Sequence, residues 1–157
     1  MNSLLEALAS IAMAVGYGVG SALIPIMNAE AAVGAAGATL PVGLAVSISV
    51  ALAAGQTFGK IAIFEAARKG AQLHQARKQA PKKPMPPWQQ RLVKSLDGRW
   101  QTNGVVLLSA GLGLPPLAIV SIAAGAVQSR RMDFAVCCLV GRTARFLLVV
   151  SALLLAQ

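Results

Sequence analysis

Charged side chains within long apolar stretches need a functional or structural reason. Glu30 is the only charge between Glu6 and Lys60, and Arg142 and Arg145 lie in the apolar segment that ends the chain. An ionisable group at the centre of a bilayer costs at least ~2.5–3.5 kcal/mol. The guanidinium of arginine is a planar fork that fits the oxygens of a phosphate. Glu30, Arg142 and Arg145 are therefore the candidate substrate-binding residues.

Each candidate also has a simpler explanation. Glu30 follows the helix-breaking Pro25 and falls near a helix N-terminus, where the helix dipole stabilises an acid exposed to the interface. The functional alternative is a carboxyl in a wet cavity that carries a proton or senses a headgroup. The two arginines lie about one helical turn apart. They either hold a phosphate or form an ion pair with Glu30 or Glu65 that only stabilises the fold.

The sequence offers no pattern for a soluble-type active site. It has no nucleophile–base pair, no metal-ligand cluster and no phosphate-cradling loop. Cys137 and Cys138 are adjacent in an apolar run, which favours a packing role over a disulfide or a metal site. We expect no enzymatic activity, no catalytic residue, no bound metal and no cofactor. Coupling of transport to a proton or a sodium ion stays open.

The composition predicts an all-α membrane protein. Only 12% of the 157 residues are charged, against about 25% in a soluble domain. Three uncharged stretches, residues 7–29, 31–59 and 101–129, each exceed the ~20 residues that span a bilayer as a helix. Because they are rich in Ala, Gly and Leu and lack a period of two, strands are not expected.

The middle of the chain is basic and predicts a cytoplasmic loop over residues 68–99. Nine of the 14 Lys and Arg residues of the chain lie there: Arg68, Lys69, Arg77, Lys78, Lys82, Lys83, Arg91, Lys94 and Arg99. Basic connections between apolar segments favour the cytoplasmic side and an anionic lipid surface. Nucleic acid is not an expected partner, because the aromatic residues that stack bases are missing apart from Trp88.

The uncharged stretch 101–129 is interrupted in its middle. Its 29 residues would make a helix of roughly 43 Å, too long for one upright crossing and too short for two. Helix-breaking residues lie at its centre: Gly113, Pro115 and Pro116. A re-entrant hairpin is favoured over a kinked crossing, because it returns Arg130 and Arg131 to the side of the basic loop.

The first half of the chain follows the same plan. An apolar arm, Ser3–Ala22, leads to the break at Pro25, and a short arm, Ala29–Leu40, leads to Pro41. A long segment then reaches the basic loop, as Phe134–Leu155 closes the second half. Whether Ser3–Ala22 crosses the bilayer completely stays open, as does the side that the N-terminus faces.

The two halves share short sequence patterns. Pro25 and Pro116 each precede a glycine by nine positions, and Gly55-Gln56-Thr57 matches Gly141-Arg142-Thr143. The predicted fold is therefore two inverted repeats, residues 1–67 and 100–157, each a re-entrant helical hairpin followed by a transmembrane helix. This is a transporter architecture. The residues assigned to the re-entrant breaks are Pro25, Gly34, Gly37, Gly113, Pro115, Pro116 and Gly125.

Small residues recur at every fourth position after Pro41. They are Gly43, Ser47, Ala51, Gly55 and Gly59. One helix face lined in this way lets another backbone approach closely, and a re-entrant arm is the expected neighbour. Gly55, Gly59 and Gly141 are the predicted packing glycines; Gly141 leaves room beside Arg145.

Several of these patterns, taken in order, resemble motifs of the DedA family, also called VTT or SNARE-associated membrane proteins. The first is Leu23-Ile24-Pro25-Ile26-Met27-Asn28-Ala29-Glu30 followed by Gly34 and Gly37. The others are Ile63-Phe64-Glu65-Ala66-Ala67-Arg68-Lys69-Gly70, then Gly113-Leu114-Pro115-Pro116, Ala124-Gly125, Phe134 and Gly141-Arg142-Thr143-Ala144-Arg145-Phe146. The resemblance covers about residues 20–150 discontinuously. The family often has Asp where this chain has Gln56 or Lys60.

The resemblance implies translocation of a phosphorylated lipid, either a phospholipid or a polyprenyl phosphate carrier. The implied location is the bacterial cytoplasmic membrane, with several crossings and with homo-oligomers left open. Two alternatives remain: a small ion-coupled exporter of cationic compounds that uses Glu30, or a structural, holin-like protein without substrate. A net positive site around the arginines favours the lipid, and a net negative site around Glu30 favours the exporter.

Overall fold

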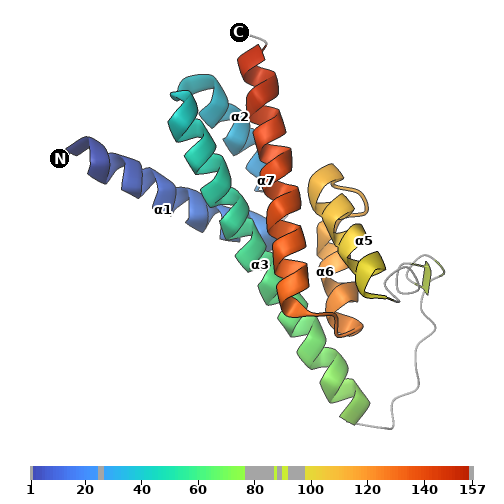
Figure 1. The fold of residues 1–157 in the computed structure, drawn as a ribbon. Helices are drawn as coiled ribbons and strands as arrows, with labels where there is room; N and C mark the ends of the chain where they lie inside the picture. Colours follow the sequence, from blue (N-terminus) through green and yellow to red (C-terminus); the bar gives the residue numbers. More distant parts are fainter. Residues whose placement is uncertain (1, 25–26, 77–86, 88–89, 92–97, 156–157) are drawn as a thin grey trace. The chain divides into compact units, whose positions relative to one another are not determined.

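Helices joined by turns make up the described part of the chain in the computed structural model, which describes residues 2–24, 27–76, 87, 90–91 and 98–155. Its six helices are α1 (Asn2–Leu23), α2 (Ala29–Thr39), α3 (Val42–Ala76), α5 (Arg99–Leu112), α6 (Leu117–Ala126) and α7 (Arg131–Leu155), shown in Figure 1. No strand occurs among these residues, so the predicted all-α class is confirmed for them. Pro25, Trp88 and most of the basic loop lie outside the described residues.

Three of the helices are long and apolar enough to cross a bilayer. The candidate spans are Leu4–Leu23 in α1, Val42–Leu73 in α3 and Arg131–Leu153 in α7. Helix α3 has 35 residues, or about 52 Å, so it must tilt in or extend beyond a hydrocarbon core of ~30 Å. Helix α6 is also apolar, but its 10 residues make only about 15 Å. These lengths are compatible with an integral membrane protein.

Helix α3 continues further than the sequence pattern suggested. The basic loop was expected from residue 68, yet the helix runs on to Ala76. Its last two turns contain mainly good helix formers, among them Lys69, Ala71, Gln72 and Leu73, and no proline. The positive charge of Arg68 and Lys69 is therefore presented on a helix end.

The short arm α2 has well-defined ends. The Asn28 side-chain Oδ1 accepts hydrogen bonds from the backbone N–H groups of Glu30 (2.9 Å) and Ala31 (3.4 Å), which caps the helix N-terminus. The helix ends at Thr39, where the Leu40 N–H still reaches the Ala36 carbonyl at 3.0 Å and Pro41 follows. The predicted arm, Ala29–Leu40, agrees with α2 to one residue.

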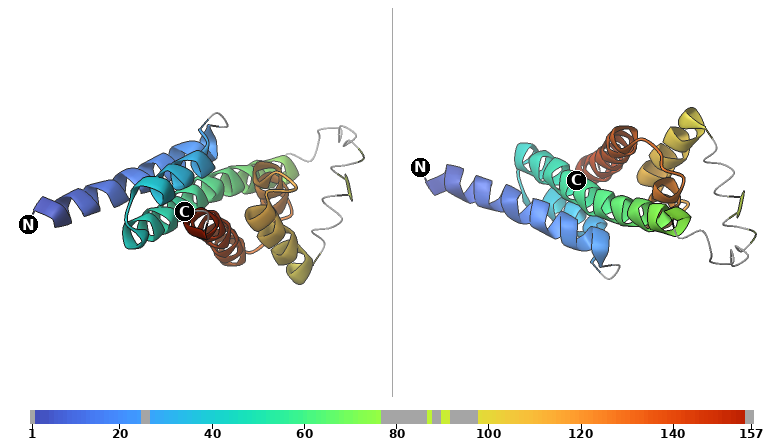
Figure 2. Two further views of the ribbon diagram at one scale, coloured as in Figure 1. Left: turned by 90° about the horizontal axis from the view of Figure 1, so that it is seen from above. Right: turned by 90° about the horizontal axis from the view of Figure 1, so that it is seen from below.

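Helices α5 and α6 form a helical hairpin around the predicted break. Helix α5 ends at Leu112, and Gly113 adopts a left-handed conformation (φ +83°) that a residue with a Cβ rarely takes. The Ser109 hydroxyl donates to the Pro115 carbonyl at 2.5 Å, and Pro116 precedes the first turn of α6. The two helices lie side by side in both views of Figure 2. Helix α5 therefore ends and α6 begins at the residues where the sequence predicts an interruption.

The helices pack into two compact units, each with its own core. Unit 1 comprises Met1–Gly59 and Leu139–Gln157, and unit 2 comprises Lys60–Cys138. The core of unit 1 is Ala14, Ala29, Val33, Ala45, Ala51, Leu52, Ala53, Phe146 and Val150. The core of unit 2 is Phe64, Val106, Ala110, Leu117, Val120, Ala124, Phe134 and Cys138. Because α3 and α7 each contribute to both units, the units do not coincide with the two halves of the sequence.

Candidate functional site

Glu30 and Arg145, two of the three predicted binding residues, form an ion pair in unit 1. The Arg145 Nη2 atom lies 2.5 Å from the Glu30 Oε1 atom. Glu30 is in the first turn of α2, where Asn28 caps the helix and the dipole favours a carboxylate. The pair is not sealed in the core, since the Glu30 side chain is 48% exposed and that of Arg145 is 27% exposed.

Arg142, the third predicted residue, is held by a polar chain that crosses three helices. Its Nη1 atom donates to the Gln56 Oε1 atom on α3. The Gln56 Nε2 atom in turn donates to the Ser21 Oγ atom on α1, at 2.8 Å. The Ser21 hydroxyl completes the chain by donating to the Gly18 carbonyl at 2.9 Å. Gln56 is only 4% exposed, so its amide is a buried polar group with a partner on each side.

The two contacts belong to one site. Arg142 and Arg145 are three residues apart on α7, a spacing that places their side chains on neighbouring positions of one helix face. Glu30 approaches this face from α2, and Gln56 approaches it from α3. We call Ser21, Glu30, Gln56, Arg142 and Arg145 the arginine site.

Unit 1 contains few charged residues. They are two acids, Glu6 and Glu30, and two bases, Arg142 and Arg145. Glu6 lies 15 residues before Ser21 on α1, or roughly 22 Å along the helix axis. Among the acids of the unit, only Glu30 is thus at the arginine site, where its carboxylate pairs with Arg145.

The small residues of α3 bring this helix against α1 over part of the predicted stripe. A Cβ on Gly59 would lie 2.5 Å from the Cβ of Ala22, and one on Gly55 would overlap the Val15 carbonyl of α1. Gly18 of α1 is equally close, because its Cβ would lie 2.5 Å from the Leu52 carbonyl. Such contact between backbones needs glycine. This close contact between α1 and α3 also brings Ser21 within hydrogen-bonding distance of Gln56.

The stripe does not continue to the start of α3. Gly43 has no atom within 4 Å of its would-be Cβ, and Ser47 is exposed. The contact with α1 therefore starts near Leu52. Gly141, the third predicted packing glycine, is buried on α7 next to Arg142.

Both short arms pack through a glycine against a long helix. Gly37 of α2 faces Val150 and Leu153 of α7 in unit 1, with the Leu153 Cδ1 atom 3.3 Å from its would-be Cβ. In unit 2, a Cβ on Gly125 of α6 would overlap the Phe64 carbonyl of α3. Gly34 has open space around it and makes no such contact.

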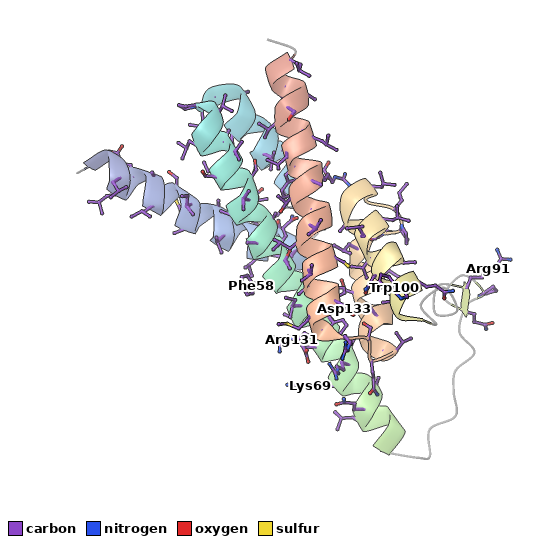
Figure 3. The ribbon with its side chains drawn as sticks, in the orientation of Figure 1. Phe58, Lys69, Arg91, Trp100, Arg131 and Asp133 are labelled. Atoms are coloured by element: carbon purple, nitrogen blue, oxygen red, sulfur yellow. The ribbon has the colours of Figure 1, made fainter. Side chains whose placement is uncertain are left out.

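Arg131 of α7 and Gly125 of α6 both contact the C-terminal part of α3 within unit 2. The Arg131 Nε atom lies 3.6 Å from the Glu65 Oε1 atom, and the would-be Cβ of Gly125 lies 3.2 Å from the Arg68 backbone nitrogen. Figure 3 labels Arg131 on α7 and Lys69 on α3. The end of the α5–α6 hairpin thus returns to the end of α3 that carries the basic residues.

Sequence reasoning found the charged members of the arginine site and missed the neutral ones. Gln56 appeared only as part of the repeated Gly-Gln-Thr pattern, and Ser21 did not appear at all. Gln56 could have been noticed because it is a polar residue in an apolar helix, one position after Gly55 of the small-residue stripe. Ser21 gives no such signal, because a serine satisfies its own hydroxyl within an apolar helix.

Comparison of the chain with protein-family models, with curated proteins and with solved structures found no match. The resemblance to the DedA family accordingly stays a prediction from the quoted motifs. The arginine site has to be interpreted from its own chemistry.

Proposed function

We propose that this chain moves a lipid with a phosphate-bearing headgroup across a bilayer, and that the arginine site binds the phosphate. The observation that carries the proposal is the Glu30–Arg145 ion pair beside Arg142. Two guanidinium groups on one helix face supply the forked donors that phosphate oxygens accept. Both members of the pair are partly exposed, which gives a headgroup a route to them.

In this mechanism Glu30 is the counter-ion of the empty site. A phosphate that binds Arg142 and Arg145 displaces the Glu30 carboxylate, and Glu30 returns when the lipid leaves. The headgroup then crosses by way of the arginine site while its acyl or prenyl tails stay among the lipids. Protonation of the displaced carboxyl would couple the cycle to a proton.

The purely structural alternative has limited energetic support, because an ion pair contributes little net stability. Desolvation offsets the attraction in a buried pair, and an exposed pair in water is worth about 0–1 kcal/mol. The exporter of cationic compounds would use the Glu30 carboxylate, which is already paired with Arg145.

Two contacts support the arrangement of the halves as inverted repeats. Each short arm packs through a glycine on the long helix of the other half, Gly37 on α7 and Gly125 on α3, although Gly34, which has the same spacing from a proline as Gly125, makes no such contact. The two Gly-x-Thr patterns also contact each other. Gln56 and Arg142 occupy the middle position of their patterns, and the two side chains are hydrogen-bonded. Equivalent residues of two inverted repeats meet in this way at the axis that relates the repeats.

A vesicle assay tests the proposal. The purified chain is reconstituted with phosphatidylglycerol that carries a fluorophore on one acyl tail, and a reductant that cannot cross the membrane quenches the outer leaflet. We expect the protein to make the inner-leaflet lipid accessible, and to do so more slowly for an uncharged glycolipid with the same fluorophore. Transport of a cationic dye without movement of either lipid would contradict the proposal and favour the exporter.

A further inference from the structure

The geometry points to a membrane anchor in unit 2, in which the open end of the α5–α6 hairpin and the adjoining part of α3 bind the headgroups of an anionic leaflet. We call the residues of this anchor the basic end: Arg68, Lys69, Trp100, Arg130, Arg131 and Met132. The inference goes beyond the proposed function, since it concerns neither the arginine site nor the movement of lipid.

The net charge of the chain falls entirely in unit 2. Residues 60–138 contain 12 of the 14 Lys and Arg residues and three of the five Asp and Glu residues, whereas the two acids and two bases of unit 1 balance each other. The formal net charge of +9 is therefore that of unit 2. Because ion pairs and hydrogen bonds within the protein do not change this sum, the surface that complements unit 2 is an anionic one.

The hairpin places Trp100 and Arg130 at the same end of unit 2. Its bend lies at residues 113–116, and α5 and α6 run back from the bend beside each other (Figure 1). Trp100 lies 12 residues before the end of α5, or roughly 18 Å from the bend, and α6 extends roughly 15 Å. The chain turns directly after α6, and α7 begins at Arg131. The first turn of α5 and the first turn of α7 therefore both lie at the open end.

The C-terminal part of α3 joins this end through two contacts. The Arg131 Nε atom lies 3.6 Å from the Glu65 Oε1 atom. The would-be Cβ of Gly125, in the last turn of α6, lies 3.2 Å from the backbone nitrogen of Arg68, and the exposed Lys69 follows. Bases from α3, from α7 and from the connection before α7 are thus brought to one end of the unit.

Two acids lie near these bases without balancing them. Glu65 pairs with Arg131, and Asp133 lies in the first turn of α7. The basic end contains four bases, so it stays positive with both carboxylates ionised.

Two large apolar side chains are exposed among the bases. Trp100 is 86% exposed and Met132 is 75% exposed. An indole, with an apolar ring and an N–H donor, favours the headgroup level of a bilayer. The candidate span of α7 begins at Arg131, so the apolar part of that helix starts beside the bases. This combination fits the border of a bilayer better than a nucleic acid, which binds to successive stacking rings.

The test is quenching of Trp100 fluorescence in the full chain, reconstituted in bilayers of phosphatidylglycerol and phosphatidylcholine. Trp88→Phe leaves Trp100 as the single tryptophan. In one series phosphatidylglycerol carries bromine atoms on its acyl chains, and in the other phosphatidylcholine does, because bromine quenches tryptophan on contact. We expect the two quenching curves to give a preference for phosphatidylglycerol of at least about threefold, which high salt reduces.

Paired variants locate the source of the preference. Arg130→Gln/Arg131→Gln should lower it by at least about twofold, because these bases lie at the end that carries Trp100. Lys82→Gln/Lys83→Gln is the matched control, which removes the same charge from unit 2 outside the basic end and should leave the preference nearly unchanged. Arg130→Lys/Arg131→Lys should also keep it, since attraction to a lipid surface needs charge rather than a guanidinium fork. If the first variant does not fold, Lys69→Gln/Arg130→Gln removes two charges from the same end, with the same expected loss.

Three outcomes would overturn the anchor. Equal losses in the two glutamine pairs would show that the net charge alone attracts the lipid. Quenching that is absent, or equal for the two brominated lipids, would remove Trp100 from an anionic lipid surface. Binding of single-stranded RNA by the parent in detergent, without a lipid preference, would assign the charge to a nucleic acid. None of these results depends on lipid movement, so the proposed function succeeds or fails separately.

Discussion

The Arg145 guanidinium lies 2.5 Å from the carboxylate of Glu30, although the two residues are 115 positions apart in the chain. The contact joins the first turn of α2 to the middle of α7. It brings together two charges that the sequence places in separate apolar stretches. We propose that this ion pair forms when the arginine site holds no phosphate, and the predictions below follow from this proposal.

Replacing either arginine by lysine should weaken lipid transport by about tenfold. Lysine keeps the charge but loses the fork that holds two phosphate oxygens at once. The measurement is the transport rate of fluorescent phosphatidylglycerol for Arg142→Lys and Arg145→Lys in vesicles. Arg131→Lys is the matched control, since Arg131 also pairs with an acid but lies in unit 2. Equal rates for all three variants and the parent would exclude recognition through the guanidinium fork.

Glu30→Gln should tighten binding of phosphatidylglycerol and slow its transport. The carboxylate competes with the phosphate for Arg145, so its removal takes one negative charge from the site and delays release of the phosphate. Binding is followed by thermal stabilisation in detergent and transport by the vesicle assay. The counter-ion role would be wrong if the variant bound the lipid more weakly than the parent.

The packing glycines allow a prediction with an internal control. Gly55→Leu and Gly59→Leu should each destabilise the protein by about 1–3 kcal/mol or more, because the side chain would have to enter the backbone of α1. Gly43→Leu lies on the same stripe but meets no atom within 4 Å, and should change stability little. Thermal unfolding in detergent compares the three. A similar loss in Gly43→Leu would show that the effect does not come from contact with α1.

The topology can be tested by labelling single cysteines in a Cys137→Ala/Cys138→Ala background. Lys69 and Arg130 should be labelled from the same, cytoplasmic side, because the end of the α5–α6 hairpin lies beside the end of α3 in unit 2. Ser151 lies 20 residues beyond Arg131 on α7, or about 30 Å, and should be labelled from the opposite side. Labelling of Lys69 and Arg130 from different sides would exclude the re-entrant hairpin.

The sequence was informative where a single residue determines local structure. Gly113 and Pro116 mark the end of α5 and the start of α6, and Pro41 marks the end of α2, because glycine and proline act on the backbone regardless of what surrounds them. The helical class followed from long uncharged stretches. The length of α3 was underestimated, since charged residues such as Lys69 are good helix formers as well as loop markers.

The sequence was less informative where structure depends on contacts between distant segments. Glu30 and Arg145 stood out because charge is rare in apolar sequence, and their pairing was one of two explanations left open. Gln56 and Ser21 stayed hidden, because their role comes only from the crossing of α1, α3 and α7. The small-residue stripe from Gly43 to Gly59 predicts one continuous packing face, yet Gly55 and Gly59 contact α1 while Gly43 has no atom within 4 Å of its would-be Cβ.

The most direct test of the account is the movement of phosphatidylglycerol by a well-folded Arg142→Gln/Arg145→Gln variant. Glutamine keeps hydrogen-bonding capacity but removes both positive charges from the arginine site. Folding is checked first by helix content and thermal unfolding, because Glu30 loses its partner in this variant. We predict that the variant moves phosphatidylglycerol in vesicles no faster than protein-free vesicles do, while the parent moves it readily. A folded variant that transports the lipid as fast as the parent would contradict the central claim that this site recognises the phosphate.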